Sequence, residues 1–144
     1  MRILVDADGC PVVEEAVAIA VKNNLECFLL CDTAHVLQKE GAKTLTFSTG
    51  ADSVDFALVN LAKAGDIVVT QDYGLAAMCL ARGCIPLDQN GRVYYENNID
   101  SLLQSRHLAR KIRRGGGRLK GSAKRKAEQN HAFMEALRKI VEEH

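Results

Sequence analysis

The chain has 144 residues, a length that suits one compact domain, and 47% of them are hydrophobic, enough to bury a core. This composition excludes a disordered chain. Apolar runs stay well below the ~20 residues that a membrane-spanning helix needs. Asp6 interrupts the first of these runs, which is not typical of a signal peptide. Five cysteines without zinc-finger spacing indicate reduced, buried thiols. We therefore expect a cytoplasmic protein without a membrane partner.

The formal net charge of +1 conceals an uneven distribution along the chain. Residues 1–105 carry 7 Lys and Arg against 14 Asp and Glu. Residues 106–126 carry 10 Lys and Arg and no acid, and residues 127–144 carry 2 against 4. An acidic body with a basic segment indicates an acidic site together with a contact to a polyanion. The alternative is a basic stretch that is only solvated and contacts no partner.

Strands and helices are expected to alternate along the first two thirds of the chain. Short apolar runs predict buried strands, and they lie at residues 3–5, 25–31, 45–47, 67–69 and 85–87. Helical spacing and capping signals predict helices between the strands, over residues 11–21, 33–41, 52–65 and 75–83. This alternation predicts an α/β fold in which helices cover both faces of a mostly parallel sheet.

The last third of the chain is expected to add a hairpin, a basic segment and a final helix to the sheet. A strong turn signal, Asn90-Gly91, predicts a hairpin at the edge of the sheet. Residues 106–126 are expected to form a basic, partly flexible segment. Residues 127–144 carry one apolar stripe at helical spacing, which predicts a helix docked on the body. We expect residues 1–144 to form a single domain.

Five aspartates stand where the predicted strands end or the helices begin, and no lysine or arginine lies within three residues of them. They are Asp6, Asp8, Asp52, Asp55 and Asp72. In open parallel sheets ligands gather beyond the carboxyl ends of the strands, so we expect these carboxylates to converge there. Carboxylates that lie close together cannot all stay ionised without compensation, and their hard oxygens favour Mg²⁺ or Mn²⁺. The pattern therefore predicts a catalytic site in which these five aspartates bind Mg²⁺ or Mn²⁺.

Each aspartate taken alone has a simpler structural explanation. An Asp after a strand is most often a helix cap or a turn residue, and Asp52 is the clearest candidate cap. Asp55 lies inside a predicted helix, where a cap explains nothing, and Asp6-x-Asp8 exceeds what one cap requires. The joint pattern therefore supports the metal site. Asp66 opens a strand, so we expect it at the opposite edge of the sheet in a structural role.

Several segments resemble a known family. They are led by Val5–Val12, Gly65–Asp72 and Leu75–Ala77, of which the first and third are specific. Together with residues 50–55 and the predicted hairpin, they look like the YaiI/YqxD family of small bacterial proteins. The resemblance spans nearly the whole chain.

That family is placed with PIN-like domains, whose relatives include metal-dependent ribonucleases. The resemblance implies a PIN-like three-layer fold with a mostly parallel sheet, an edge hairpin and C-terminal helices. PIN-like sites use acids after the first strand, at a helix start in mid-chain and after the fourth strand. Asp6, Asp52 or Asp55, and Asp72 match those places, while Asp8 belongs to the narrower family's own motif.

The first functional hypothesis is a Mg²⁺- or Mn²⁺-dependent nuclease that hydrolyses phosphodiester bonds, with RNA favoured as the nucleic-acid partner. The five aspartates would hold the metal and position water. Basic side chains would contact phosphates, and they are Arg106, Arg110, Lys111, Arg113, Arg114, Arg118, Lys120, Lys124, Arg125 and Lys126. The same segment has no aromatic residues for base stacking, so sequence-specific reading is not indicated.

Two other functions are compatible with the same residues. A non-catalytic protein would use the metal for stability and the basic segment to hold RNA. A phosphatase of the haloacid-dehalogenase type would use Asp6 as a nucleophile and Asp8 as an acid and base. In this chain Cys10 replaces the usual threonine of that motif, and no convincing lysine follows a later strand.

Overall fold

The computed structural model describes residues 1–32, 38–48, 53–101, 104 and 124–144. Five parallel strands form one sheet in the order β3-β2-β1-β4-β5. The strands are β1 (Arg2–Asp6), β2 (Glu26–Asp32), β3 (Lys43–Phe47), β4 (Ile67–Val69) and β5 (Ile85–Leu87). The labelled helices are α1 (Val13–Lys22), α2 (Ser53–Leu61), α3 (Tyr73–Ala81) and α5 (Ala127–Glu143). Each predicted strand is therefore present.

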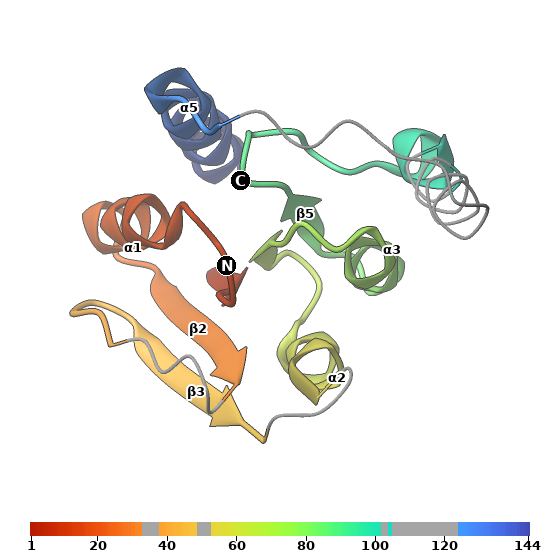
Figure 1. Cartoon of the computed structure of the whole chain (residues 1–144), viewed down its shortest axis with the longest axis horizontal. Helices are drawn as coiled ribbons and strands as arrows, with labels where there is room; N and C mark the ends of the chain where they lie inside the picture. Colours follow the sequence, from red (N-terminus) through yellow and green to blue (C-terminus); the bar gives the residue numbers. More distant parts are fainter. Residues whose placement is uncertain (33–37, 49–52, 102–103, 105–123) are drawn as a thin grey trace.

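Helices cover both faces of the sheet, so the fold has three layers (Figure 1). Side chains alternate between the two faces along each strand. Ile3 and Val5 therefore join the core under α1 and α5, whereas Leu4 joins the core under α2 and α3. Because both faces are covered, the central strands are apolar at nearly every position, and all of β4 is buried. This confirms the predicted α/β fold and is consistent with a PIN-like arrangement.

The edge hairpin is much shorter than the sequence indicates. Leu87 and Val93 form a single antiparallel bridge next to β5, and the sheet itself is entirely parallel. The Asp88 carboxylate accepts hydrogen bonds from the backbone N–H groups of Asn90 and Arg92, which closes the turn. Asn98 Oδ1 then accepts from the N–H of Tyr95, and helical residues begin at 96, so the pairing ends there.

Another difference concerns the helix predicted over residues 33–41. Residues 38–41 are not helical, and residues 33–37 lie outside the described part of the chain. Gly41 has a φ of +92°, a conformation that ends regular right-handed structure. A Cβ at this position would also lie 2.5 Å from a methyl carbon of Val21, so the chain passes close to α1 here.

The last helix docks on the body as its apolar stripe predicts. Phe133, Leu137 and Ile140 are buried against the core that α1 also covers. Burying side chains of this size stabilises by ~1.5–3 kcal/mol each. The docking is close at the hairpin turn, because a Cβ at Gly91 would lie 2.6 Å from the Ala132 carbonyl oxygen.

A buried ion pair closes the opposite edge of the sheet. Arg2 Nη2 donates to Asp66 Oδ2 at 2.6 Å, and the backbone N–H of Lys63 donates to the same oxygen at 2.9 Å. Burial alone would raise the pKa of Asp66, but the hydrogen bonds from Arg2 and Lys63 outweigh it and lower that pKa. Asp66 thus has the structural role expected for it.

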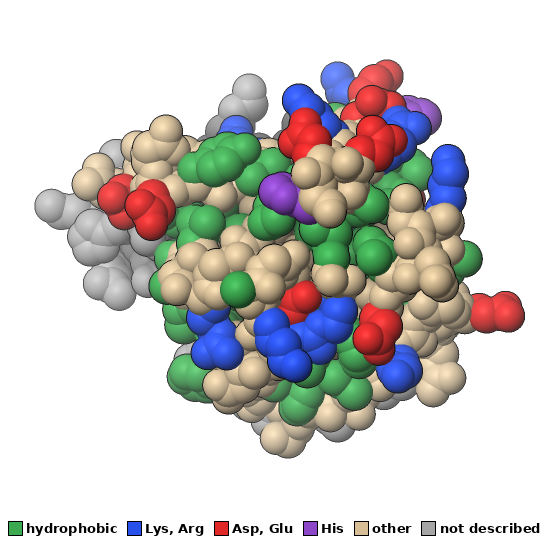
Figure 2. All heavy atoms as spheres, turned by 180° about the vertical axis from the view of Figure 1, so that it is seen from behind, with side chains coloured by type: hydrophobic (Ala, Val, Ile, Leu, Met, Phe, Trp, Pro, Cys, Tyr) green, Lys and Arg blue, Asp and Glu red, His purple; other side chains and the backbone are tan. Residues whose placement is uncertain are grey.

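Two further features of the molecule are the distribution of charge on its surface and the character of its helices. On the face drawn in Figure 2, acidic and basic side chains are intermingled in most places. Within the described part of the chain, no helix combines the length and the apolar character needed to span a membrane.

Candidate functional site

The ends of β1 and β4 meet at one edge of the sheet. Val5 pairs with Val69 in the parallel register, so Asp6 and Thr70 are brought side by side although 64 residues separate them. Thr70 Oγ1 donates a hydrogen bond to Asp6 Oδ2 at 2.9 Å, and it accepts one from the N–H of Asp72 at 3.0 Å. One hydroxyl therefore links the two acidic segments.

Asp72 is the N-cap of α3. Its Oδ1 accepts hydrogen bonds from the N–H groups of Gly74 at 2.9 Å and Leu75 at 3.2 Å. An N-cap of this kind typically stabilises a helix by about 1 kcal/mol. The cap also fixes the orientation of the carboxyl group at the sheet edge. A cap is the simpler explanation for each of the five aspartates alone, and Asp72 has that role; Asp52, the clearest candidate cap, lies outside the described residues.

Asp8 lies in the turn that leaves β1. Its Oδ2 accepts a hydrogen bond from the N–H of Asp32, the last residue of β2, at 3.0 Å. Gly9 follows with a φ of +69°, which a residue with a Cβ rarely adopts. The Gly9 carbonyl lies 3.5 Å from Gln71 Nε2, so the β1 turn and the segment after β4 lie opposite each other.

An open groove of about 600 Å³ lies between these two segments. It is lined by Asp6, Asp8, Gly9, Gln71, Asp72 and Tyr73. Three of the five predicted aspartates therefore share one groove. Sequence reasoning did not select Gln71 and Tyr73, which flank Asp72; their position directly after a buried strand is the signal that points to them.

The electrostatics of the groove show in Asp6. Burial, with a smaller contribution from the charges of Asp55, Asp72 and Asp8, raises the pKa of Asp6 to about 6, although the hydrogen bond from Thr70 opposes the shift. Asp55 lies in the first turn of α2, so the charges of three other carboxylates act on Asp6 at this edge. An acid in a cleft whose pKa is raised by burial and by neighbouring charges is a candidate for a functional site.

The described aspartates do not form a complete metal site. Among the residues that the structure describes, no three His, Cys, Asp or Glu side chains are arranged so that they could hold a metal ion. Mg²⁺ usually binds through one or two carboxylates, keeps several waters and takes phosphate oxygens as further ligands. The hard oxygens of Asp6, Asp8 and Asp72 fit an ion held in that way, and do not fit one enclosed by protein.

The basic segment is described only at its end, where it enters α5. Arg106, Arg110, Lys111, Arg113, Arg114, Arg118 and Lys120 lie outside the described residues. Lys124, Arg125 and Lys126 are described.

Arg125 contacts three groups of the protein itself. Its Nε donates to Asn130 Oδ1 at 2.7 Å, its Nη1 to Asn90 Oδ1 at 2.7 Å, and its Nη2 to the Gln89 carbonyl at 2.6 Å. It therefore ties the start of α5 to the turn after β5. Burial raises the pKa of the Cys10 thiol to about 11, with Asp6 adding to the shift and Arg125 opposing it. The guanidinium thus lies within electrostatic reach of the turn that leaves β1.

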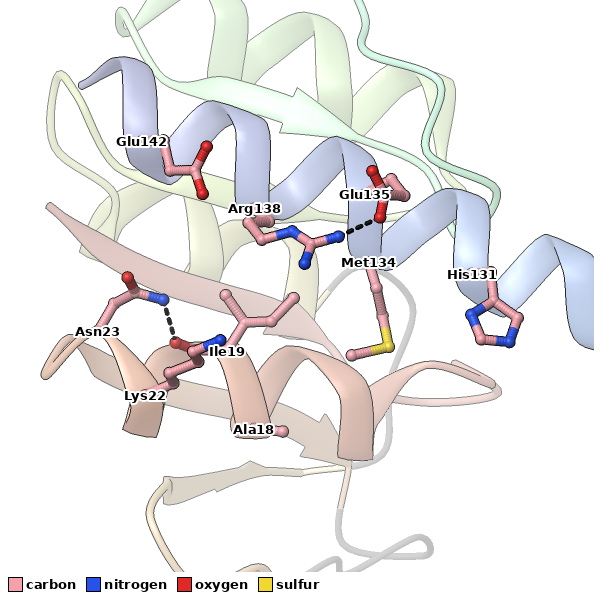
Figure 3. A pocket seen from close by; sticks show the side chains of 9 residues that line it. All are labelled: Ala18, Ile19, Lys22, Asn23, His131, Met134, Glu135, Arg138 and Glu142. Carbon is pink, nitrogen blue, oxygen red and sulfur yellow. Dashed lines mark hydrogen bonds and ion pairs between the residues drawn. The ribbon is translucent and has the colours of Figure 1, made fainter.

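A second hollow of about 330 Å³ lies between α1 and α5 (Figure 3). Ile19 and Met134 point into the space between the helices, while Arg138 pairs with Glu135 along α5. The charges at its rim have both signs, and its acids do not converge with one another. The ionisable side chains of this hollow are spread along its rim and do not converge on one point, so the aspartate groove is the better candidate.

Comparison with known proteins places the chain in a family. Residues 4–143 match the family described as "Uncharacterized BCR, YaiI/YqxD family". The chain is 50% identical over 143 residues to a "UPF0178 protein" of Exiguobacterium sibiricum, with 99% of this chain and 98% of the relative covered. It is 47% identical over 137 residues to a "UPF0178 protein" of Ruminiclostridium cellulolyticum, with 95% and 90% covered. No solved structure matches it. The chain therefore belongs to the YaiI/YqxD family of bacterial proteins.

Proposed function

We propose that this protein is a Mg²⁺- or Mn²⁺-dependent nuclease that hydrolyses phosphodiester bonds in RNA. The observation that carries the proposal is the linkage of Asp6 and Asp72 through the hydroxyl of Thr70 at the end of two adjacent strands. This linkage fixes the Asp6 carboxylate and the backbone of Asp72 beside an open groove, and the N-cap hydrogen bonds of α3 fix the Asp72 carboxylate. The raised pKa of Asp6 supports the proposal, because a divalent cation would compensate the negative charge that burial of this carboxylate makes unfavourable.

The metal would be held by Asp6 and Asp72, with Asp8 beside them in the groove. When bound, Mg²⁺ or Mn²⁺ supplies a lowered pKa for bound water and stabilisation of charge on phosphate oxygens. Thr70 keeps the Asp6 carboxylate oriented, and the α3 cap keeps Asp72 oriented. Asp55 adds negative charge from α2, which favours a cation in the groove. The basic segment would contact phosphates away from the groove.

The test is cleavage of a labelled single-stranded RNA with Mn²⁺, with Mg²⁺, and with EDTA. We expect cleavage only with metal, and a loss of at least 100-fold in rate for Asp6→Asn, by analogy with removal of one electrostatic group from an active site. Asp88→Asn is the matched control. Its side chain accepts hydrogen bonds within the hairpin turn, a role that asparagine also fills, and it does not line the groove. Cleavage in EDTA, or full activity of Asp6→Asn, would contradict the proposal.

A second function, metal and RNA binding without turnover, is favoured by one observation. Asp8 Oδ2 and Asp72 Oδ1 already accept hydrogen bonds from backbone N–H groups, so these carboxylates also have a structural role. This function predicts RNA binding that survives Asp6→Asn and Asp72→Asn, with no cleavage under any metal condition. The phosphatase alternative receives less support, because the described residues that line the groove include no lysine to accompany the aspartates.

A further inference from the structure

Tyr73 brings an aromatic ring to the rim of the aspartate groove. It is the first residue of α3, it follows Asp72 directly, and it is partly exposed. Among the described residues that line the groove, it is the one aromatic side chain. Its place in the fold is set by the cap, because Asp72 Oδ1 holds the N–H groups of the two residues that follow Tyr73.

A second tyrosine holds the Tyr73 ring in position. The rings of Tyr73 and Tyr94 meet edge to face, with centroids 5.9 Å apart and planes at 63°. Tyr94 is only 1% exposed, and its hydroxyl donates to the Thr70 carbonyl at 3.2 Å. Thr70 in turn donates to Asp6. A continuous set of contacts therefore links the ring at the rim to the carboxylate on the groove floor.

The groove needs a neutral contact for its ligand. No lysine or arginine is among the described residues that line it, and three carboxylates are. A phosphate that enters this groove is repelled unless a metal ion compensates, and the groove itself supplies no positive side chain to help. A pre-positioned aromatic ring offers attraction that does not depend on charge, and holding it costs little conformational entropy on binding.

We propose that Tyr73 stacks on a nucleobase beside the phosphodiester that lies over the aspartates, and that the substrate is therefore single-stranded. This inference rests on the proposed nuclease function and specifies its substrate class. Every base has an aromatic face, so a stack of this kind tolerates any sequence. In a duplex the bases are stacked on one another and do not present that face, so double-stranded nucleic acid lacks this contact.

A direct test uses the fact that the chain contains no tryptophan. Tyr73→Trp introduces one fluorophore at the rim of the groove. We expect a single-stranded RNA oligomer, in Ca²⁺ so that it is not cleaved, to quench its fluorescence. The same sequence as a duplex, and an oligomer with base-less ribose residues, should not quench it. Equal quenching by the base-less oligomer, or none by the single strand, would overturn the inference. Tyr95→Trp is the control, since Tyr95 is 58% exposed and does not line the groove.

Kinetics and binding give the second readout. Tyr73→Leu should raise the KM for single-stranded RNA by about 5- to 150-fold, the range of one base–aromatic stack, while kcat changes little. Tyr73→Phe should restore the wild-type KM, because the ring and not the hydroxyl makes the contact. The base-less oligomer should show the same KM with every variant. If Tyr73→Leu raises that KM too, the residue is only structural and the inference fails.

The two proposals fail in different ways. Fluorescence anisotropy measures binding of a labelled single strand. If Tyr73→Leu binds it more weakly but the unaltered protein does not cleave it, the nuclease is rejected and the stacking contact is retained. Metal-dependent cleavage that Tyr73→Leu leaves unchanged would retain the nuclease and reject the stack. A circular-dichroism melting curve on each variant checks that it is folded. If Tyr73→Leu is unfolded, the fluorescence experiment with Tyr73→Trp still tests the stacking contact.

Discussion

The hydroxyl of Thr70 donates to the carboxylate of Asp6 at 2.9 Å while it accepts from the backbone N–H of Asp72 at 3.0 Å. A hydroxyl has one proton to donate, so its bond to the carboxylate fixes the direction of both contacts. The donor stabilises the ionised form of Asp6, against the burial that raises its pKa. Thr70 therefore both orients the carboxylate of Asp6 and stabilises its negative charge.

Replacing this hydroxyl should weaken metal binding without removing a ligand. We expect Thr70→Val to lower Mn²⁺ affinity by roughly 10- to 100-fold, the usual effect of losing a group that orients a ligand. Isothermal titration at pH 7.5 measures the affinity. Thr70→Ser keeps the hydroxyl and should bind like the unaltered protein. Equal affinities for the valine and serine variants would show that the hydrogen bond to Asp6 has no part in binding.

The charge of Asp6 should destabilise the metal-free protein at neutral pH. Its pKa is about 6 in the folded state and ~3.9 in an unfolded chain. The folded state therefore binds more protons between these values, so stability rises as pH falls from 7 to 4. We expect Asp6→Asn to be more stable than the unaltered protein by up to about 2 kcal/mol at pH 7.5, after allowance for partial exposure.

Thermal unfolding in EDTA across pH 4 to 8 measures this effect. The gain from Asp6→Asn should shrink toward pH 4, where the unaltered protein is itself protonated at this site. Asp88→Asn is measured over the same range as the control. A stability difference for Asp6→Asn that is constant over the whole range would contradict the assigned pKa.

The ion pair at the opposite edge should show the reverse pH dependence. The folded-state pKa of Asp66 is lowered, so its contribution is present above the unfolded value of ~3.9 and is lost as pH falls through the lower, folded value. Arg2→Met leaves Asp66, which is 4% exposed, without its partner and should cost about 3 kcal/mol at pH 7. Urea unfolding at pH 7 and below pH 3 measures both effects, and the cost should be smaller in acid.

Two neighbouring basic residues should differ in what they contribute. Arg125 makes three internal hydrogen bonds, so Arg125→Met should lower the melting temperature by several degrees. Lys124 is exposed, and Lys124→Ala should leave the melting temperature unchanged. If Lys124 contacts a phosphate, its removal reduces the log–log salt slope of binding to single-stranded RNA by ~0.7. If Arg125→Met melts at the same temperature as the unaltered protein, the three hydrogen bonds of Arg125 do not stabilise the fold.

The sequence predicts the fold because local pattern and global arrangement agree. Apolar runs such as Ile67–Val69 have no polar face, which requires burial on both sides, and the alternation with helices makes the strands parallel. The positions of Asp6 and Asp72 follow from that topology, since parallel strands end at the same edge.

Other features depend on contacts that no local pattern encodes. Thr70 finishes a strand, and its link to Asp6 arises only from the register of β1 with β4. Tyr73 lies just before the helix predicted over residues 75–83, and no local pattern indicates that Tyr94, distant in sequence, packs against its ring. In the sequence Arg125 is one of a run of basic residues, whereas in the structure it donates hydrogen bonds to the turn after β5. The hairpin is shortened because the turn bonds of Asp88 and the helix from residue 96 redirect the chain.

The order of the strands has a last consequence for where a ligand can lie. The chain runs outward from β1 to β3 and then crosses back to β4 on the other side of β1. The connections that leave β1 and β4 therefore part, one leading to α1 on the first face and the other to α3 on the second (Figure 1). This divergence is the switch point at which open α/β sheets leave a crevice. The path of the backbone therefore sets the place of the opening, and the side chains along its walls set its chemistry.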